Sequence, residues 1–291
     1  MPTAPCGRRR QPMADTTRIH GSDGTGLATY AAGDPANPAI LLIHGWAQQS
    51  LCWAPVKDRL KDRFHIVTMD LRGHGASDKP EDTSAYTDTT LWGDDVAAVI
   101  AAHRLDAPTL VGWSYGSRVI AAYLASHGDA AIAGVALAGG ILAIGAAREA
   151  WMAGPASPAL DRDLYTSDLA RLIPATARFV DACTAAPLDR QTYGEMVGAN
   201  MLCPAHVRRA LFGADVDMRP AYAAMTCPGL VIHGTADTIV APATGEAAAQ
   251  TMRKGRFLPY DGIGHAPFLE APNRFAADLS AFIQTASKEP A

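Results

Sequence analysis

The sequence predicts an α/β protein in which a mostly parallel sheet is flanked by helices and carries one inserted helical segment. Short apolar runs that end at Gly, Asp or Ser alternate with longer stretches of helical periodicity, as expected for strands joined by crossover helices. Residues 39–43, Ala-Ile-Leu-Leu-Ile, are continuously apolar, which is typical of a parallel strand buried on both faces. Residues 141–225 contain several helical stretches, breakers such as Pro174, and no convincing strand.

The elements can be assigned in order along the chain. A hairpin is expected first, with strands at residues 17–20 and 27–32 around the turn Ser22-Asp23-Gly24. Further strands are expected at residues 39–43, 64–69, 109–112, 134–138, 229–233 and 255–259, and helices at residues 90–104, 117–127, 243–253 and 273–285. Together they predict a three-layer sandwich, and the adjacent acids Asp94 and Asp95 are expected on its solvated face.

These elements divide the chain into three parts. Residues 14–140 and 226–291 are expected to form the core, residues 141–225 a helical cap, and residues 1–13 a disordered tail. The tail carries three arginines but is not followed by the apolar run of a signal peptide. The longest uncharged apolar stretch, residues 132–147, is shorter than the roughly 18–20 residues that a transmembrane helix needs. A cytoplasmic protein without a membrane partner is therefore expected.

The composition argues against several classes of function. The 291 residues carry 25 Lys and Arg against 29 Asp and Glu, and a formal charge of −4 gives no strong positive field for nucleic acid. The five cysteines are an odd number without close pairing, which favours reduced thiols. Cys203 and His206 form an isolated C-x-x-H that lacks the second ligand pair of a zinc site. No metal, cofactor or nucleic acid is expected, and the oligomeric state stays open.

The strongest chemical signal is Gly112-Trp113-Ser114-Tyr115-Gly116, which lies between a predicted strand and a predicted helix. Glycines are needed on both sides because the chain reverses sharply there and holds the central residue in a strained conformation. The Ser114 hydroxyl would then stand exposed at the head of the helix. The pattern therefore predicts that Ser114 is a nucleophile.

A serine nucleophile needs a base, and the base needs a carboxylate to orient it. Of nine histidines, His265 alone follows the last strand on a glycine-flanked loop, at the sheet edge where α/β sites form. Asp237 follows the preceding strand, and the chain order Ser…Asp…His favours it as the partner of His265. Asp261 is the rival, although its closeness to His265 in the sequence suggests a role in the turn instead.

The oxyanion of an acyl-transfer reaction needs backbone N–H donors. The residue after the nucleophile, Tyr115, would supply one, and Trp46, on the loop after an early strand, would supply the other. His44 is expected to brace this loop. The Trp46 indole could either line the pocket or simply pack in the core.

These motifs resemble those of α/β-hydrolase-fold serine hydrolases, from Arg18 to Ala286. The segments that carry the resemblance are HGW at His44, DLRGHGASD at Asp70, GWSYG at Ser114, HGTAD at Asp237 and GIGHAPFLEAP at His265. The resemblance implies that the segment from Asp70 is a structural turn, so that Arg72 and His74 have no catalytic role. At Ser117 the sequence differs from many relatives, which have a second glycine after the nucleophile elbow, the sharp turn that holds Ser114 here.

Within this superfamily the serine at the elbow disfavours haloalkane dehalogenases and epoxide hydrolases, which resemble this layout but use aspartate. The chain looks most like carboxylesterases such as the pimeloyl-acyl-carrier-protein methyl ester esterases. It is also similar to enol-lactonases and to cofactor-free haloperoxidases with perhydrolase activity.

The leading hypothesis is hydrolysis of a small-molecule carboxylic ester through an acyl-enzyme on Ser114. The alternatives are a lactone or C–C bond hydrolase or a perhydrolase with the same triad, and a hydrolase-like ligand receptor without catalysis. The cap arginines Arg178, Arg208 and Arg209 are expected on a solvated face. The physiological substrate stays open.

Overall fold

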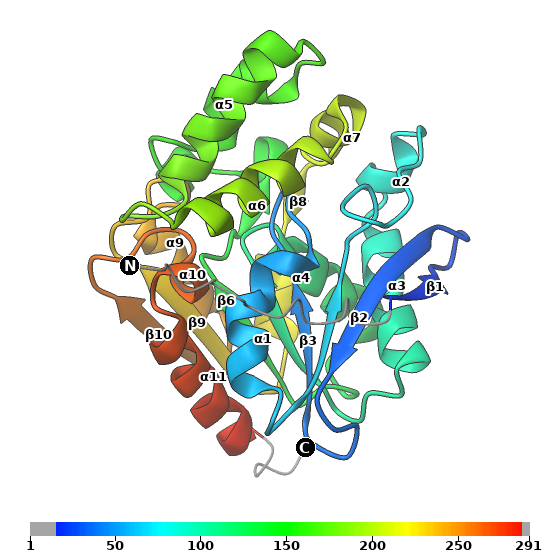
Figure 1. Cartoon of the computed structure of the whole chain (residues 1–291). Coiled ribbons are helices and arrows are strands. Elements are labelled where there is room, and N and C mark those ends of the chain that lie inside the picture. The colour runs from blue at the N-terminus through cyan, green and yellow to red at the C-terminus, as the bar shows by residue number, and fades with distance from the viewer. Residues whose placement is uncertain (1–15, 287–291) are drawn as a thin grey trace, which may run out of the picture.

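The computed structural model describes residues 16–286 and confirms the predicted α/β architecture (Figure 1). One eight-stranded sheet has the order β1-β2-β4-β3-β5-β6-β9-β10. β2 pairs antiparallel with β1 and β4, and all later neighbours are parallel. The strands are β1 Thr16–His20, β2 Gly26–Ala32, β3 Ala39–Ile43, β4 His65–Met69, β5 Thr109–Trp113, β6 Gly134–Ala138, β9 Gly229–Gly234 and β10 Gly255–Tyr260.

Helices cover both faces of the sheet, which explains why its central strands are continuously apolar. Along β3, Leu41 and Ile43 enter one buried cluster while Ile40 and Leu42 enter the other, because successive side chains of a strand point to opposite faces. The first cluster is covered by α3 Thr89–Ala102, α4 Gly116–His127 and α9 Pro242–Thr251, and the second by α1 Ala54–Leu60 and α11 Pro272–Ala286.

The strand register places the loops that matter at one edge. Ile43 pairs with Gly112, Trp113 with Ala138, and Gly234 with Tyr260. Parallel strands in register end together, so the loops after β3, β5, β9 and β10 meet at the carboxyl edge of the sheet.

Residues 141–225 lie over this edge, where Figure 1 shows α5, α6 and α7 above the sheet. The helices of this segment are α5 Leu169–Ala182, α6 Arg190–Met201, α7 Ala205–Ala210 and α8 Arg219–Ala224. Two further short helices lie outside it, α2 Ser84–Thr87 and α10 Pro267–Glu270. Short 3-10 turns span Ser50–Trp53, Gly145–Ala147, Ala150–Met152, Pro158–Leu160 and Arg162–Tyr165.

Two details of this segment differ from the sequence-based expectation. The segment does contain strands, because β7 Ala143–Ile144 pairs antiparallel with β8 Val216–Asp217. Two-residue strands are too short to show an alternating pattern, so the sequence could not reveal them. Pro174, expected as a breaker, lies inside α5.

Two expectations about charged residues were wrong. Asp95 is buried rather than solvated, and both its oxygens accept 2.7 Å hydrogen bonds from the buried guanidinium of Arg72. Asp94 is nearer the surface, where it accepts a hydrogen bond from Ser22. Arg208 is also fully buried, whereas Arg178 and Arg209 are exposed as expected. The Arg208 guanidinium is satisfied by the backbone carbonyls of residues 164, 200 and 203.

The tail expected at residues 1–13 lies outside the described residues. Within residues 16–286, no helix has the length and apolar character needed to cross a membrane.

Candidate active site

Ser114 occupies the turn between β5 and α4, and its backbone has φ +51°, a conformation that L residues rarely adopt. A Cβ on Gly112 would lie 2.8 Å from the Gly116 carbonyl carbon, and one on Gly116 would lie 2.6 Å from the Ile43 carbonyl oxygen. Both positions therefore require glycine, as the sequence pattern predicted. The Ser114 N–H donates to the Ala138 carbonyl at 2.9 Å, which ties the strained turn to the neighbouring strand.

Ser117, the departure from a second glycine, is part of the same turn. Its hydroxyl donates to the Ser114 carbonyl and accepts a 2.9 Å hydrogen bond from the Ile141 N–H. The small side chain therefore links the elbow to the first residue of the segment that covers the site.

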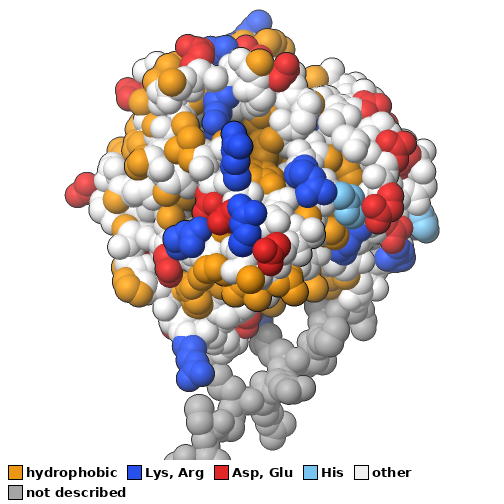
Figure 2. Space-filling view, turned by 90° about the horizontal axis from the view of Figure 1, so that it is seen from above, with side chains coloured by type: hydrophobic (Ala, Val, Ile, Leu, Met, Phe, Trp, Pro, Cys, Tyr) orange, Lys and Arg blue, Asp and Glu red, His pale blue; other side chains and the backbone are white. Residues whose placement is uncertain are grey.

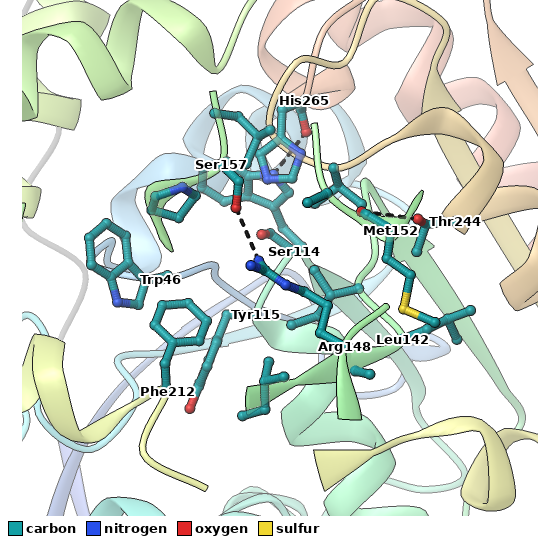
Figure 3. A pocket seen from close by; sticks show the side chains of 18 of the residues that line it. Trp46, Ser114, Tyr115, Leu142, Arg148, Met152, Ser157, Phe212, Thr244 and His265 are labelled. Carbon is teal, nitrogen blue, oxygen red and sulfur yellow. Dashed lines mark hydrogen bonds between the residues drawn. The ribbon is translucent and has the colours of Figure 1, made fainter. Parts of the chain in front are cut away.

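Ser114 and His265 line one pocket between the sheet edge and the covering segment (Figure 3). The pocket encloses about 610 Å³, counting the space open to solvent at its mouth. Its walls are mainly apolar and include Trp46, Leu142 and Phe212. Figure 2 views the molecule from this side and shows basic side chains gathered around exposed hydrophobic atoms.

His265 and Asp237 are brought together although they are far apart in the sequence. The imidazole Nδ1 lies 2.8 Å from Asp237 Oδ2, and both side chains are buried. The other carboxylate oxygen, Oδ1, accepts the N–H groups of Ile239 at 2.8 Å and Val240 at 2.9 Å. Burial opposes the charge of Asp237, but the nearby imidazoles and their hydrogen bonds outweigh it and hold its pKa well below the usual range.

The rival acid, Asp261, points elsewhere. It is exposed and accepts a 3.2 Å hydrogen bond from the Thr235 hydroxyl. The geometry therefore pairs His265 with Asp237, the residue that the chain order favoured.

The loop that carries His265 is fixed from several sides. Trp113, next to Ser114, donates its indole N–H to the His265 carbonyl at 2.9 Å. The Glu270 carboxylate accepts the Gly264 N–H through one oxygen and the Ala185 N–H through the other, both at 2.8 Å. Glu270 thus connects the histidine loop to the covering segment, and burial raises its pKa.

The expected oxyanion donors flank the elbow. Neither the Trp46 N–H nor the Tyr115 N–H donates to any protein acceptor within residues 16–286. A Cβ on Gly45 would lie 3.3 Å from Ser114 Cβ, so the loop that carries Trp46 packs directly on the elbow. The Trp46 indole lines the pocket, which answers the question that the sequence left open.

His44 holds this loop as expected. Its Nδ1 lies 2.8 Å from the Gly45 carbonyl, and its Nε2 accepts the Leu71 N–H at 3.0 Å. These two bonds require a neutral ring, and burial lowers the pKa of His44 to about 4.

Buried arginines lie over the rings of both expected oxyanion residues. The Arg208 guanidinium lies 5.5 Å from the Trp46 ring, and that of Arg118 lies 5.3 Å from the Tyr115 ring. Cation–π contacts of this kind fix the two aromatic side chains beside the site.

Two residues near the site were not predicted from the sequence. His233, the last residue of the strand expected at residues 229–233, was not singled out among the nine histidines, yet its Nε2 lies 2.9 Å from Asp237 Oδ2, the same oxygen that contacts His265. Its position four residues before Asp237 was the available signal. Arg148 was not singled out, because only the folded chain brings it into the pocket.

Comparisons with known proteins identify the family of this chain. The Alpha/beta hydrolase family model matches residues 40–278, and the chain belongs to this family. A pimeloyl-[acyl-carrier protein] methyl ester esterase of Xanthomonas campestris pv. campestris is 32% identical over 258 residues, which cover 84% of this chain and 95% of that protein. The bifunctional esterase/perhydrolase DCH of Acinetobacter calcoaceticus is 25% identical over 281 residues, which cover 90% of this chain and 98% of that protein.

Among solved structures, the esterase RhEst1 from Rhodococcus sp. ECU1013 has a TM-score of 0.88 and 34% identity, and the match covers 93% of this chain and 99% of that one. The predicted resemblance is thereby confirmed. The protein is an enzyme, a hydrolase of the carboxylic ester type.

Proposed function

We propose that the protein hydrolyses a small-molecule carboxylic ester through an acyl-enzyme on Ser114. The observation that carries the proposal is the convergence of a strained serine and an aspartate-bound imidazole on one pocket. Residues 141–225 act as the cap that forms the roof of this pocket.

The first half of the reaction forms the acyl-enzyme. Ser114 Oγ attacks the ester carbonyl while His265 Nε2 takes its proton, and Asp237 holds the imidazole in the tautomer with Nδ1 protonated. The Trp46 and Tyr115 N–H groups bind the oxyanion. Collapse of the tetrahedral intermediate breaks the bond to the alcohol, which leaves with the proton from His265.

The second half releases the acid. Water attacks the acyl carbon while His265 takes a proton from it, and collapse of the second intermediate returns that proton to Ser114. The net reaction is ester plus water to acid plus alcohol, with all groups of the enzyme restored.

A perhydrolase is a second candidate, favoured by the likeness to the esterase/perhydrolase of Acinetobacter calcoaceticus. In that reaction hydrogen peroxide replaces water in the second half, so that a peracid is released. The same acyl-enzyme serves both outcomes, and peracid formation at millimolar peroxide would distinguish them.

The decisive experiment compares wild type with Ser114→Ala on a short p-nitrophenyl ester. We expect the variant to lose about 10⁴-fold or more in kcat, as typical of removing a nucleophile. A fluorophosphonate probe should label wild type at Ser114 and leave the variant unlabelled. Wild-type turnover by the purified, folded variant would refute the assignment of the nucleophile, and so would failure of the probe to label the folded wild type.

A further inference from the structure

One permanently charged side chain, Arg148, stands among the described residues that line the pocket. It follows the 3-10 turn Gly145–Ala147 and is half-buried. Figure 3 shows its side chain reaching across the pocket toward Ser114 and Ser157. The guanidinium Nη1 donates to the Ser157 hydroxyl at 3.1 Å.

The charge of Arg148 is not matched by a carboxylate within residues 16–286. The acid next to it, Glu149, pairs with Arg219 at 2.8 Å, and Asp161 pairs with Arg178 at 2.9 Å. Arg72 is different, since two acids satisfy its buried guanidinium. Arg148 therefore presents an unmatched charge to the pocket that holds Ser114.

This arrangement leaves most donors of the Arg148 guanidinium free for a ligand. A guanidinium has five N–H donors in a planar fork that matches a carboxylate, and one neutral hydroxyl occupies a single donor here. The surrounding wall is apolar, so an anion that reaches the guanidinium would meet little competition from other protein groups.

We propose that Arg148 binds a carboxylate on the substrate, and that the enzyme prefers an ester that carries a free carboxylate within reach of its scissile carbonyl. This inference rests on the proposed ester hydrolysis and names its substrate class. The carboxylate belongs either to the acyl part, as in a monoester of a dicarboxylic acid, or to the alcohol part.

The test uses matched esters that differ in one charge. Monomethyl glutarate carries the charge on the acyl side, and dimethyl glutarate is its neutral partner. Carboxymethyl butanoate carries the charge on the alcohol side, and its methyl ester is the neutral partner. The readout is the ratio of kcat/KM for the charged ester to kcat/KM for its neutral partner. Monomethyl succinate and monomethyl adipate then define the reach of the guanidinium.

Arg148→Met keeps much of the aliphatic length and removes the charge. We expect it to lower the charged-to-neutral ratio about tenfold for one of the two pairs, as is typical of losing a charge-assisted hydrogen bond near solvent. Arg148→Lys should retain part of the preference, because it keeps the charge without the planar fork. Arg148→Gln gives the same comparison should the methionine variant fail to fold.

Two controls separate recognition from structure. Arg178→Gln removes a cap arginine outside the pocket and should leave the ratio unchanged. Ser157→Ala removes the hydrogen bond of Arg148 and keeps its charge, so it should preserve the ratio. If Arg148 only tied the loop, Arg148→Met and Ser157→Ala would lower kcat/KM equally for both esters of a pair and leave the ratio unchanged, which would overturn the proposal.

The proposal also fails if folded Arg148→Met keeps the wild-type ratio for both ester pairs. Glutarate binding to Ser114→Ala, measured by calorimetry, separates this failure from failure of the proposed function. Binding that needs Arg148 supports the anion site whichever residue is the nucleophile, and binding that survives Arg148→Met refutes it.

Discussion

Asp237→Asn tests the proposed triad because the structure dictates how the new amide must sit. Oδ1 of Asp237 accepts the N–H groups of Ile239 and Val240, so the asparagine carbonyl oxygen must take that place. Its NH₂ group then replaces Oδ2 and faces His265 Nδ1, which lies 2.8 Å away. To avoid two opposed donors, His265 must give up its Nδ1 proton and carry the proton on Nε2.

That tautomer cannot accept the proton of Ser114. An aspartate-to-asparagine change that imposes the wrong tautomer on a triad lowers kcat by about 10⁴, which corresponds to about 5.4 kcal/mol at about 1.36 kcal/mol per tenfold. We expect a loss of this size, with the site geometry otherwise retained. His233 Nε2, 2.9 Å from the same oxygen, would meet the same NH₂ group and add to the misfit.

The assay is the initial rate of p-nitrophenyl ester hydrolysis between pH 6 and 9, with urea unfolding to show that the variant is folded. Asp261→Asn is the matched control, since it makes the same chemical change in the exposed acid beside the same loop. The kcat of this control should stay within about threefold of the wild-type value, because substitutions at exposed positions usually change free energies by less than about 0.5 kcal/mol. A folded Asp237→Asn enzyme with more than a tenth of wild-type kcat would refute the reasoning, and so would a thousandfold loss in the control.

Three further predictions concern stability, each measured by urea unfolding. Asp95→Ala should cost about 3–5 kcal/mol because it removes the buried partner of the Arg72 guanidinium and leaves only the more exposed carboxylate of Asp23, whereas Asp94→Ala should cost less than about 1 kcal/mol; equal losses would contradict this. Burial lowers the pKa of His74 from 6.5 to about 3, so the unfolded chain takes up a proton that the native chain does not, and stability falls as the pH drops below about 6.5. His74→Asn should remove about 1.4 kcal/mol per pH unit from that slope, and an unchanged slope would count against the assignment. Ser114→Gly should be more stable than Ser114→Ala by about 0.5–1 kcal/mol, because glycine relieves the positive φ at some cost in chain entropy; an alanine variant of equal or greater stability would argue against strain at the elbow.

Much of the fold and the site could be predicted because the informative patterns are local. Ala39–Ile43 shows its two-sided burial in five consecutive letters. Gly112 and Gly116 are spaced by the geometry of a single turn around Ser114. The loop positions of Asp237 and His265 follow from strands that end at one edge, so their proximity was predictable from the order of elements.

Charged and polar residues were harder, since their environment is decided by distant parts of the chain. Asp95 was expected in water because adjacent acids on a surface helix are most simply explained as part of its solvated face. Its burial depends on Arg72, which comes from the turn after β4 and lies beneath α3. Arg208 is buried against backbone carbonyls from other parts of the covering segment, and no sequence pattern marks a carbonyl as an available acceptor.

His233 shows the same limit at the site itself. A histidine that ends a strand was reasonably excluded as the base, because the base must reach the substrate. Exclusion as a base does not exclude contact with the triad: His233 lies four residues before Asp237, and the intervening turn returns the carboxylate to the ring. The Asp237 carboxylate therefore accepts hydrogen bonds from two imidazoles and two backbone N–H groups. Its low pKa follows from this set of donors rather than from exposure to water. The triad aspartate could be assigned from chain order, but the donors that keep it ionised are assembled only when β9, its turn and the His265 loop meet.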